Sequence, residues 1–174
     1  MPSRGFRGRG FTLIELMVVI CVVALLFAVA LDRLMRFQEL GERAAMEQNI
    51  AAMNVALTMK FAALVASGRP RAIEKELGAN PVENLARPPE NYLGALFMPP
   101  AELLPARSWY FDRASGDVVY MPGKTRYLSE PRDAMNGLRF RVYLTDPSPR
   151  EGETVAEIRQ ALVRPVHPYR WNVE

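Results

Sequence analysis

The sequence predicts an α+β fold, in which a long N-terminal helix packs on a small antiparallel β-sheet. Proline is absent from residues 11–67, and good helix formers dominate residues 32–67. From residue 108 onwards the pattern changes to short runs of β-branched and aromatic residues separated by turn residues, which is typical of strands. The first part of the chain is therefore expected to be helical and the last part to form the sheet.

Charge is distributed unevenly along the 174 residues. Three of the 22 basic residues, Arg4, Arg7 and Arg9, lie in the first ten positions, and no acidic residue does. The rest of the chain carries 19 basic and 19 acidic residues, so it lacks the basic footprint of a nucleic-acid-binding protein. We therefore expect no nucleic-acid partner.

Residues 11–31 are almost all apolar and contain one charged residue, Glu15. As a helix these residues span roughly 32 Å, which matches a hydrocarbon core of about 30 Å. The preceding arginines predict a cytoplasmic N-terminus and an exported C-terminal part. Three interpretations fit such a segment: a secretory signal cut after Ala30, an anchor that is never cut, and a leader removed by cleavage after Gly10.

Glu15 distinguishes these interpretations, because a charged group within a membrane span costs a few kcal/mol on insertion scales. Cleavage after Gly10 gives Phe11 a free amine, and Glu15 lies one helical turn away. In a packed array of helices, the carboxylate of one subunit can pair with the amine of its neighbour. Two such buried charges offset each other's desolvation only when they are aligned, so the pair would set the axial register.

The segment Gly10-Phe11-Thr12-Leu13-Ile14-Glu15-Leu16 resembles the prepilin cleavage and methylation motif shared by type IV pilins and type II secretion pseudopilins. The resemblance implies that Gly10 precedes the cut and that Phe11 becomes the N-methylated first residue. It also implies that Glu15 sets the register in a filament and that a membrane helix runs from Leu16 to Leu31.

The resemblance implies a filament subunit rather than an enzyme, made as a single-pass protein of the bacterial inner membrane with a periplasmic C-terminal domain. Its partners would be a prepilin peptidase, other pilins or pseudopilins, and an inner-membrane assembly platform. We expect a type II secretion pseudopilin, because Cys21 is the only cysteine and Asp32 stands where many pilins carry a proline. A minor pilin of a type IV pilus, used in assembly, adhesion or DNA uptake, is the alternative. A second alternative is a membrane-anchored binding module that never polymerises.

Five segments are expected along the chain. They are a leader (1–10), the membrane half of the helix (11–31), its amphipathic half (32–67), a connecting loop region (68–107) and the sheet of the periplasmic domain (108–174).

The amphipathic half of the helix carries one apolar face. Its residues recur at steps of three and four and are expected to pack on the sheet. They are Met46, Ile50, Met53, Leu57, Phe61 and Leu64. The polar residues Glu42, Arg43, Glu47, Asn49, Asn54 and Lys60 are expected to lie largely off this face.

The connecting region contains seven prolines, which predict an irregular loop. Short helical turns are expected around Ala72–Leu77, Pro89–Leu96 and Pro100–Leu104. In the last part, Ser108–Phe111 and Val118–Met121 predict a hairpin, which also resembles that of some pseudopilins and minor pilins.

The alternating residues Leu138–Leu144 predict a half-buried strand with Leu138, Phe140, Val142 and Leu144 inward. The segment Thr154–Arg164 fits a strand or a short helix. Val166–Val173 fits a last edge strand, because Pro168 does not suit a central one.

Residues that carry chemistry are sparse. Asp112 and Asp117 flank the hairpin turn, but calcium takes six to eight oxygen ligands, so we expect a solvated turn and no metal. His167 is the only histidine and is expected at the surface or an edge, and Cys21 is expected to fill space in the apolar run. The sequence shows no glycine-rich phosphate loop and no nucleophile elbow, so we expect no cofactor and no catalysis.

Overall fold

The computed structural model describes residues 11–129, 137–145 and 160–172. The chain divides into two compact units, residues 1–38 (unit 1) and residues 39–174 (unit 2), which are described separately. Helix α1 (Leu13–Ala66) contributes to both. The two helical segments predicted at residues 11–31 and 32–67 thus form one helix, which begins at Leu13 and ends at Ala66.

The described part of unit 1 is the first half of α1, which continues past Asp32 without a break. Every side chain from Phe11 to Leu31 is exposed within the chain. Among the described residues, α1 is the one helix that is long and apolar enough to cross a membrane. The residues of the expected membrane span therefore form an uninterrupted helix from Leu13 onwards.

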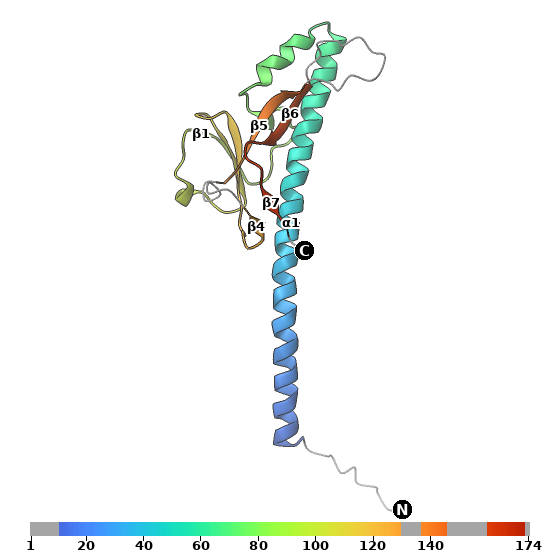
Figure 1. Cartoon of the computed structure of the whole chain (residues 1–174), viewed down its shortest axis with the longest axis vertical. Helices are drawn as coiled ribbons and strands as arrows, with labels where there is room; N and C mark the ends of the chain where they lie inside the picture. Colours follow the sequence, from blue (N-terminus) through green and yellow to red (C-terminus); the bar gives the residue numbers. More distant parts are fainter. Residues whose placement is uncertain (1–10, 130–136, 146–159, 173–174) are drawn as a thin grey trace, which may run out of the picture. The chain divides into compact units, whose positions relative to one another are not determined.

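Unit 2 contains the second half of α1, three short 3-10 helices and seven strands within the described residues (Figure 1). The 3-10 helices are η1 (Pro70–Glu76), η2 (Pro81–Asn84) and η3 (Ala101–Leu103). The strands are β1 (Tyr92–Leu96), β2 (Ser108–Asp112), β3 (Asp117–Met121), β4 (Leu128–Ser129), β5 (Leu138–Thr145), β6 (Gln160–Pro165) and β7 (Arg170–Trp171).

Five of the strands form one sheet, in the order β1-β2-β3-β5-β6. All neighbouring strands in it are antiparallel except β1 and β2, which are parallel. The α+β prediction is confirmed, and so are the hairpin of β2 and β3 and the strand β5. Gly116 lies in the hairpin turn with a φ of +73°, a conformation that L side chains rarely adopt.

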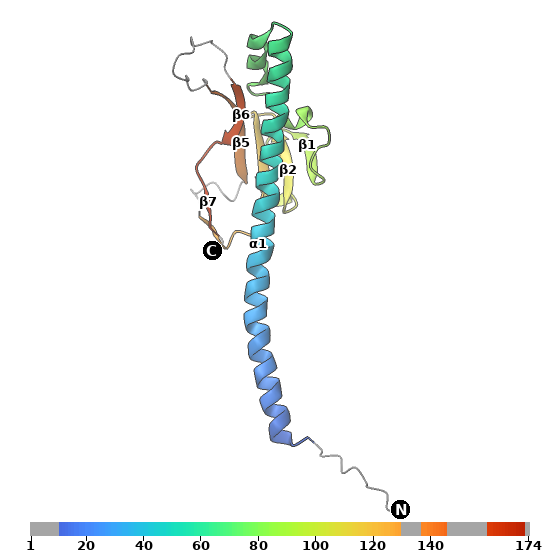
Figure 2. The ribbon, with the colours of Figure 1, turned by 90° about the vertical axis from the view of Figure 1, so that its right-hand side faces the viewer.

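One face of the sheet packs on α1, which crosses it in Figure 2. Met46, Met53 and Leu57 of α1 are buried against Trp109, Val118 and Phe140 and further residues of the same cluster. The remaining members of the predicted helix face, Ile50, Phe61 and Leu64, are partly buried against the same cluster. The predicted packing of the helix on the sheet is confirmed.

The opposite face of the sheet carries a smaller apolar cluster. Tyr110, Val119 and Met121 are buried there, with Leu96 and Leu104 packed against them. The segment after β1, which contains η3 and Leu104, therefore covers part of this face. As a result, β2 and β3 are buried along their whole length.

The connecting region departs from the prediction in one place. Pro89–Leu96 was expected to contain a helical turn, but Tyr92–Leu96 is strand β1, parallel to β2. A parallel partner needs a long connection, which η3 and the prolines supply, and Gly94 has a φ of +90°, outside the helical range. The turns expected near residues 72–77 and 100–104 are present as η1 and η3.

The C-terminal part also differs from the prediction. Of the ambiguous segment Thr154–Arg164, residues 154–159 lie outside the described residues, and the rest belongs to strand β6, the edge of the main sheet. The last strand, β7, is only two residues long and pairs with β4 in a separate two-stranded sheet. The expectation that it would extend the main sheet was therefore wrong.

Candidate functional site

The start of α1 is held by a reciprocal pair of hydrogen bonds between Thr12 and Glu15. The N–H of Glu15 donates to the Thr12 hydroxyl at 3.3 Å, and the N–H of Thr12 donates to the Glu15 carboxylate at 3.5 Å. This capping box satisfies two N–H groups that have no partner within the helix. Gly10, the expected cleavage position, lies outside the described residues.

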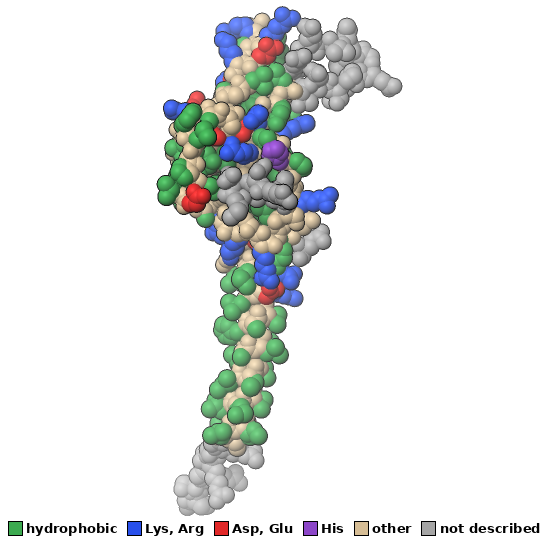
Figure 3. Space-filling model, turned by 60° about the vertical axis from the view of Figure 1, so that its left-hand side comes forward, with side chains coloured by type: hydrophobic (Ala, Val, Ile, Leu, Met, Phe, Trp, Pro, Cys, Tyr) green, Lys and Arg blue, Asp and Glu red, His purple; other side chains and the backbone are tan. Residues whose placement is uncertain are grey.

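Glu15 and its surroundings are open to other molecules. Its carboxylate is the one acidic group between Phe11 and Leu31, and it is exposed. Large apolar side chains surround it: Phe11 is 69% exposed, Leu13 81% and Ile14 70%. Figure 3 shows this apolar surface continuing along the helix. Cys21 belongs to this surface as a free, exposed thiol.

A second polar feature lies on α1 in unit 2, where Glu39 and Glu42 are both buried. The Glu42 carboxylate accepts hydrogen bonds from the Tyr120 hydroxyl at 3.1 Å and the Arg107 Nε at 3.0 Å. It also accepts one from the backbone N–H of Gly123. The expectation that Glu42 lies off the packed face was wrong, because polar partners from β3, from the loop after it and from the residue before β2 bind the carboxylate.

Glu39 connects α1 to the two-stranded sheet. One of its carboxylate oxygens accepts hydrogen bonds from the Trp171 indole at 2.8 Å and the backbone N–H of Tyr127 at 3.0 Å. One turn further on, Arg43 Nη1 donates to the Trp171 carbonyl oxygen at 2.7 Å. Sequence reasoning missed this attachment, because the partners lie 88 to 132 residues away along the chain.

Asp112 and Asp117, the aspartates that flank the hairpin turn, face arginines of β5. Arg139 donates to Asp112 at 3.1 Å and to Asp117 at 3.4 Å, and Arg141 donates to Asp117 at 2.6 Å. Within the described residues no group of three or more His, Cys, Asp and Glu side chains is placed to hold a metal. The two aspartates are buried, only 3% and 2% exposed, and pair with these arginines, so the expectation of a solvated turn was wrong.

The environment of this cluster shifts the pKa values of Asp112 and Arg139. Burial alone would raise the pKa of Asp112, but hydrogen bonds from the Ala114 N–H, Arg139 and Ser115 outweigh it, so the pKa lies below its usual value. Burial also works against the charge of Arg139, yet the bond to Asp112 raises its pKa overall. Both groups are therefore charged at neutral pH, as a structural ion pair requires.

His167 is exposed beyond the end of β6, as the sequence predicted, whereas four aromatic side chains of unit 2 are buried. Trp109, Tyr120 and Trp171 are buried in the core between α1 and the sheet, and Tyr110 is buried on the opposite face. These aromatic residues thus serve packing within unit 2.

A comparison with protein families identifies the prokaryotic N-terminal methylation motif at residues 5–31. No curated protein and no solved structure matches the chain. The matched residues contain the whole expected processing and membrane segment, including Phe11, Glu15 and Leu31.

The motif is the signature of the type IV pilin family, and the long helix packed on a mostly antiparallel sheet agrees with it. Both findings point to a subunit with a structural role that is processed and assembled with others of its kind. The chain thus carries the N-terminal methylation signature of the type IV pilins and has a pilin-like α+β architecture.

Proposed function

We propose that this chain is a filament subunit anchored in the bacterial inner membrane by residues 11–31. The observation that carries the proposal is the methylation motif at residues 5–31, which leads directly into an exposed apolar helix with a single carboxylate, Glu15. In this proposal a prepilin peptidase hydrolyses the bond between Gly10 and Phe11 and methylates the new amine of Phe11. The C-terminal domain lies in the periplasm.

Glu15 acts at two stages of this proposal. In the single subunit its carboxylate accepts the N–H of Thr12, which stabilises the helix start while no partner is present. In the filament the carboxylate faces the Phe11 amine of a neighbouring subunit. Because both charges are surrounded by apolar side chains, a shifted neighbour leaves both unpaired, and only the correct axial register is stable.

A type II secretion pseudopilus is the filament that we favour, with secretion of proteins as its task. The chain has one cysteine, so it forms no intrachain disulfide, and α1 runs through Asp32 where many pilins carry a proline. A minor pilin of a type IV pilus would use the same anchoring and register. Neighbouring genes separate the two: a secretin with platform genes favours secretion, and a retraction ATPase with a major pilin favours the pilus.

The intact mass and N-terminal sequence of the protein from its native membrane test the processing step. We expect a chain that starts at Phe11 and carries one added methyl group. A start at Leu31 would mean ordinary secretion of the C-terminal part. An intact Met1 start, in cells that contain the peptidase, would mean a plain anchor, and either result would contradict the role given to Glu15.

Replacing Glu15 by Ala tests the register step. We expect Glu15→Ala to be processed and to stay in the membrane but to be lost from sheared filaments, because the Phe11 amine of the neighbour has no partner. Cys21→Ala, a change in the same apolar segment, is the matched control and should assemble normally. Normal incorporation of Glu15→Ala would refute the register function and leave the anchoring untouched.

A further inference from the structure

A groove lies in unit 2 on the face of the sheet opposite α1, and we call it the outer groove. Its volume is about 530 Å³, within the range of about 300–1,000 Å³ that is usual for ligand sites. One wall consists of residues 98–101, which are apolar. The other wall contains Tyr110 and Asp112 of β2 and Arg139 of β5. The outer groove thus places polar groups of the sheet opposite an apolar segment.

The hydroxyl of Tyr110 lacks the partner that a buried hydroxyl normally has. Tyr110 is only 2% exposed, and within the described residues its hydroxyl makes no hydrogen bond. The hydroxyls of two other tyrosines do have partners. Asn80 donates to the Tyr92 hydroxyl at 2.9 Å, and the Tyr120 hydroxyl donates to Glu42 at 3.1 Å. An unpaired hydroxyl at the wall of a groove therefore indicates a partner from outside the chain.

Arg139 supplies further donors beside this hydroxyl. In the described part of the chain, all of its side-chain hydrogen bonds come from Nη1, which donates to Asp112, Ser115 and Asp117. Nε and Nη2 have no such bond, and the side chain is 28% exposed. Burial raises the pKa of Tyr110 and the charge of Arg139 opposes that rise, so the two groups are close. Unused donors of both residues therefore face the same groove.

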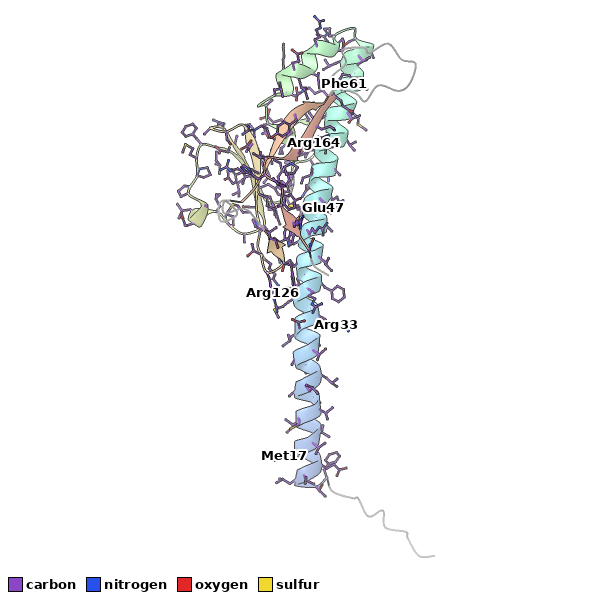
Figure 4. All side chains as sticks on the ribbon, viewed as in Figure 1. Met17, Arg33, Glu47, Phe61, Arg126 and Arg164 are labelled. Carbon is purple, nitrogen blue, oxygen red and sulfur yellow. The ribbon has the colours of Figure 1, made fainter. Side chains whose placement is uncertain are left out.

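Large apolar side chains continue from the outer groove onto the surface. Phe97 is 73% exposed, Met98 69% and Leu103 79%. In Figure 4, side chains of the segment that contains η3 project outward, on the side of the sheet away from α1. Exposed apolar groups beside a groove are typical of an interaction site. A ligand of the outer groove can therefore bury apolar surface as well as accept hydrogen bonds.

The charges of the outer groove favour a neutral or basic ligand. Asp112 and the exposed Glu102 line it together with Arg139, so two carboxylates accompany one guanidinium. A ligand carboxylate would be repelled by them, whereas a neutral carbonyl oxygen accepts the free donors without that cost. Carbonyl groups inside a helix are already bonded within the helix. The acceptor therefore belongs to an extended segment, whose carbonyl groups are available.

We propose that the outer groove binds an extended peptide segment of a partner protein. An apolar side chain of the segment packs on residues 98–101, and one of its backbone carbonyl oxygens accepts hydrogen bonds from Tyr110 and Arg139. The segment is neutral or carries a basic side chain that pairs with Glu102. This interaction involves unit 2 alone, so it holds whether or not the chain forms a filament.

A first experiment asks whether the Tyr110 hydroxyl is free in the chain alone. Tyr110→Phe should leave the melting temperature of the full chain in detergent unchanged or higher, because the hydroxyl has no bond to lose. Tyr120→Phe is the matched control and should lower it, because this variant loses a buried bond to Glu42. An equal fall for both variants would show that Tyr110 already has a structural partner, such as a bound water molecule, and would overturn the proposal.

A second experiment measures binding to the full chain in lipid nanodiscs. The probes are pools of fluorescent hexapeptides with blocked ends, each pool having one position fixed, and fluorescence polarisation reports binding. We expect pools with a fixed leucine or valine to bind and pools with a fixed aspartate or glutamate to bind less. Tyr110→Phe should weaken binding about tenfold, the effect of one hydrogen bond.

Filling the outer groove gives a second variant that spares the core. Ala114 is exposed in the hairpin turn and lines the groove, so Ala114→Trp should abolish binding. Ala45→Trp, at an exposed position of α1, is the control and should bind as the unaltered chain does. No binding by any pool, equal binding by Ala114→Trp, or a preference for acidic pools would each overturn the proposal. A chain that binds the pools but never enters a filament would contradict the proposed function alone.

Discussion

Two buried carboxylates on α1 attach the helix to the C-terminal half of the fold. Glu42 binds groups of β3, of the loop after it and of the residue before β2. Glu39 binds groups of and beside the two-stranded sheet. Buried charges are stabilising only when their oxygens are fully hydrogen-bonded. Both oxygens of Glu42 accept hydrogen bonds, whereas the two donors to Glu39 share one oxygen, so Glu42 fits that condition better.

Glu42→Ala should lower the free energy of unfolding by about 2–3 kcal/mol, since it leaves the buried Tyr120 hydroxyl without a partner. The matched control is Glu47→Ala, which breaks an exposed pair with Arg43 and should cost less than about 1 kcal/mol. Thermal unfolding of the full chain in detergent, followed by near-UV circular dichroism, measures both. Equal melting temperatures for the two variants would mean that the buried carboxylate contributes no stability.

The sequence predicted apolar residues of α1 more reliably than charged ones. Met46, Met53 and Leu57 were assigned to the packed face by spacing alone, and they are buried. Glu42 was assigned outward because a carboxylate is normally solvated, and no local signal shows that Arg107 and Tyr120 bind it. A buried charge is predictable only when its partners are known, and here they come from distant segments.

At the scale of elements, the free edge of strand β6 is covered by one side chain of α1. The N–H of Val163 donates to Asn54 Oδ1 at 2.7 Å, and Asn54 Nδ2 donates to the Val163 carbonyl oxygen at 3.4 Å. The amide of Asn54 therefore takes the place of a neighbouring strand. Unpaired edge strands are prone to pair with other chains, and this contact limits that risk.

Asn54→Leu should destabilise unit 2 by about 1–2 kcal/mol, because Val163 loses both hydrogen bonds at a partly buried position. Asn54→Asp keeps the acceptor for the Val163 N–H and loses only the donor to the Val163 carbonyl oxygen. The protection of the Val163 N–H should therefore fall less than in Asn54→Leu. Hydrogen exchange at the Val163 amide is the measurement. Gln48→Leu, at an exposed position of α1, is the control. Unchanged protection of Val163 in Asn54→Leu would contradict the edge-covering role.

Strand β1 shows why one element was predicted incorrectly. Its residues are preceded by two prolines and contain Gly94, so local signals indicate a turn. The strand forms because β2 offers a parallel partner, with Tyr92 opposite Trp109 and Ala95 opposite Phe111. Pairing with a distant strand overrides local preference here, and a single sequence contains no signal for it.

At the scale of the molecule, the sequence and the structure agree best at the N-terminus. The residues of the methylation motif and the apolar run are consecutive, so a linear pattern suffices to identify them. The sheet order depends on contacts between distant segments, and the two-stranded sheet of β4 and β7 was not predicted. The proposed membrane and filament functions thus rest on local sequence, whereas the attachment of α1 to the sheet rests on tertiary structure.

A chain that begins at Asp32 should fold without detergent, because the core between α1 and the sheet lies entirely within unit 2. A chain that begins at Ala44 keeps that core but lacks Glu39, Glu42 and Arg43. It should melt about 10 °C lower if the lost bonds are worth about 2–3 kcal/mol. Circular dichroism of both chains during heating is the measurement. An aggregated chain from Asp32 would show that unit 2 depends on residues 1–31, and equal melting of the two chains would show that packing alone attaches the helix.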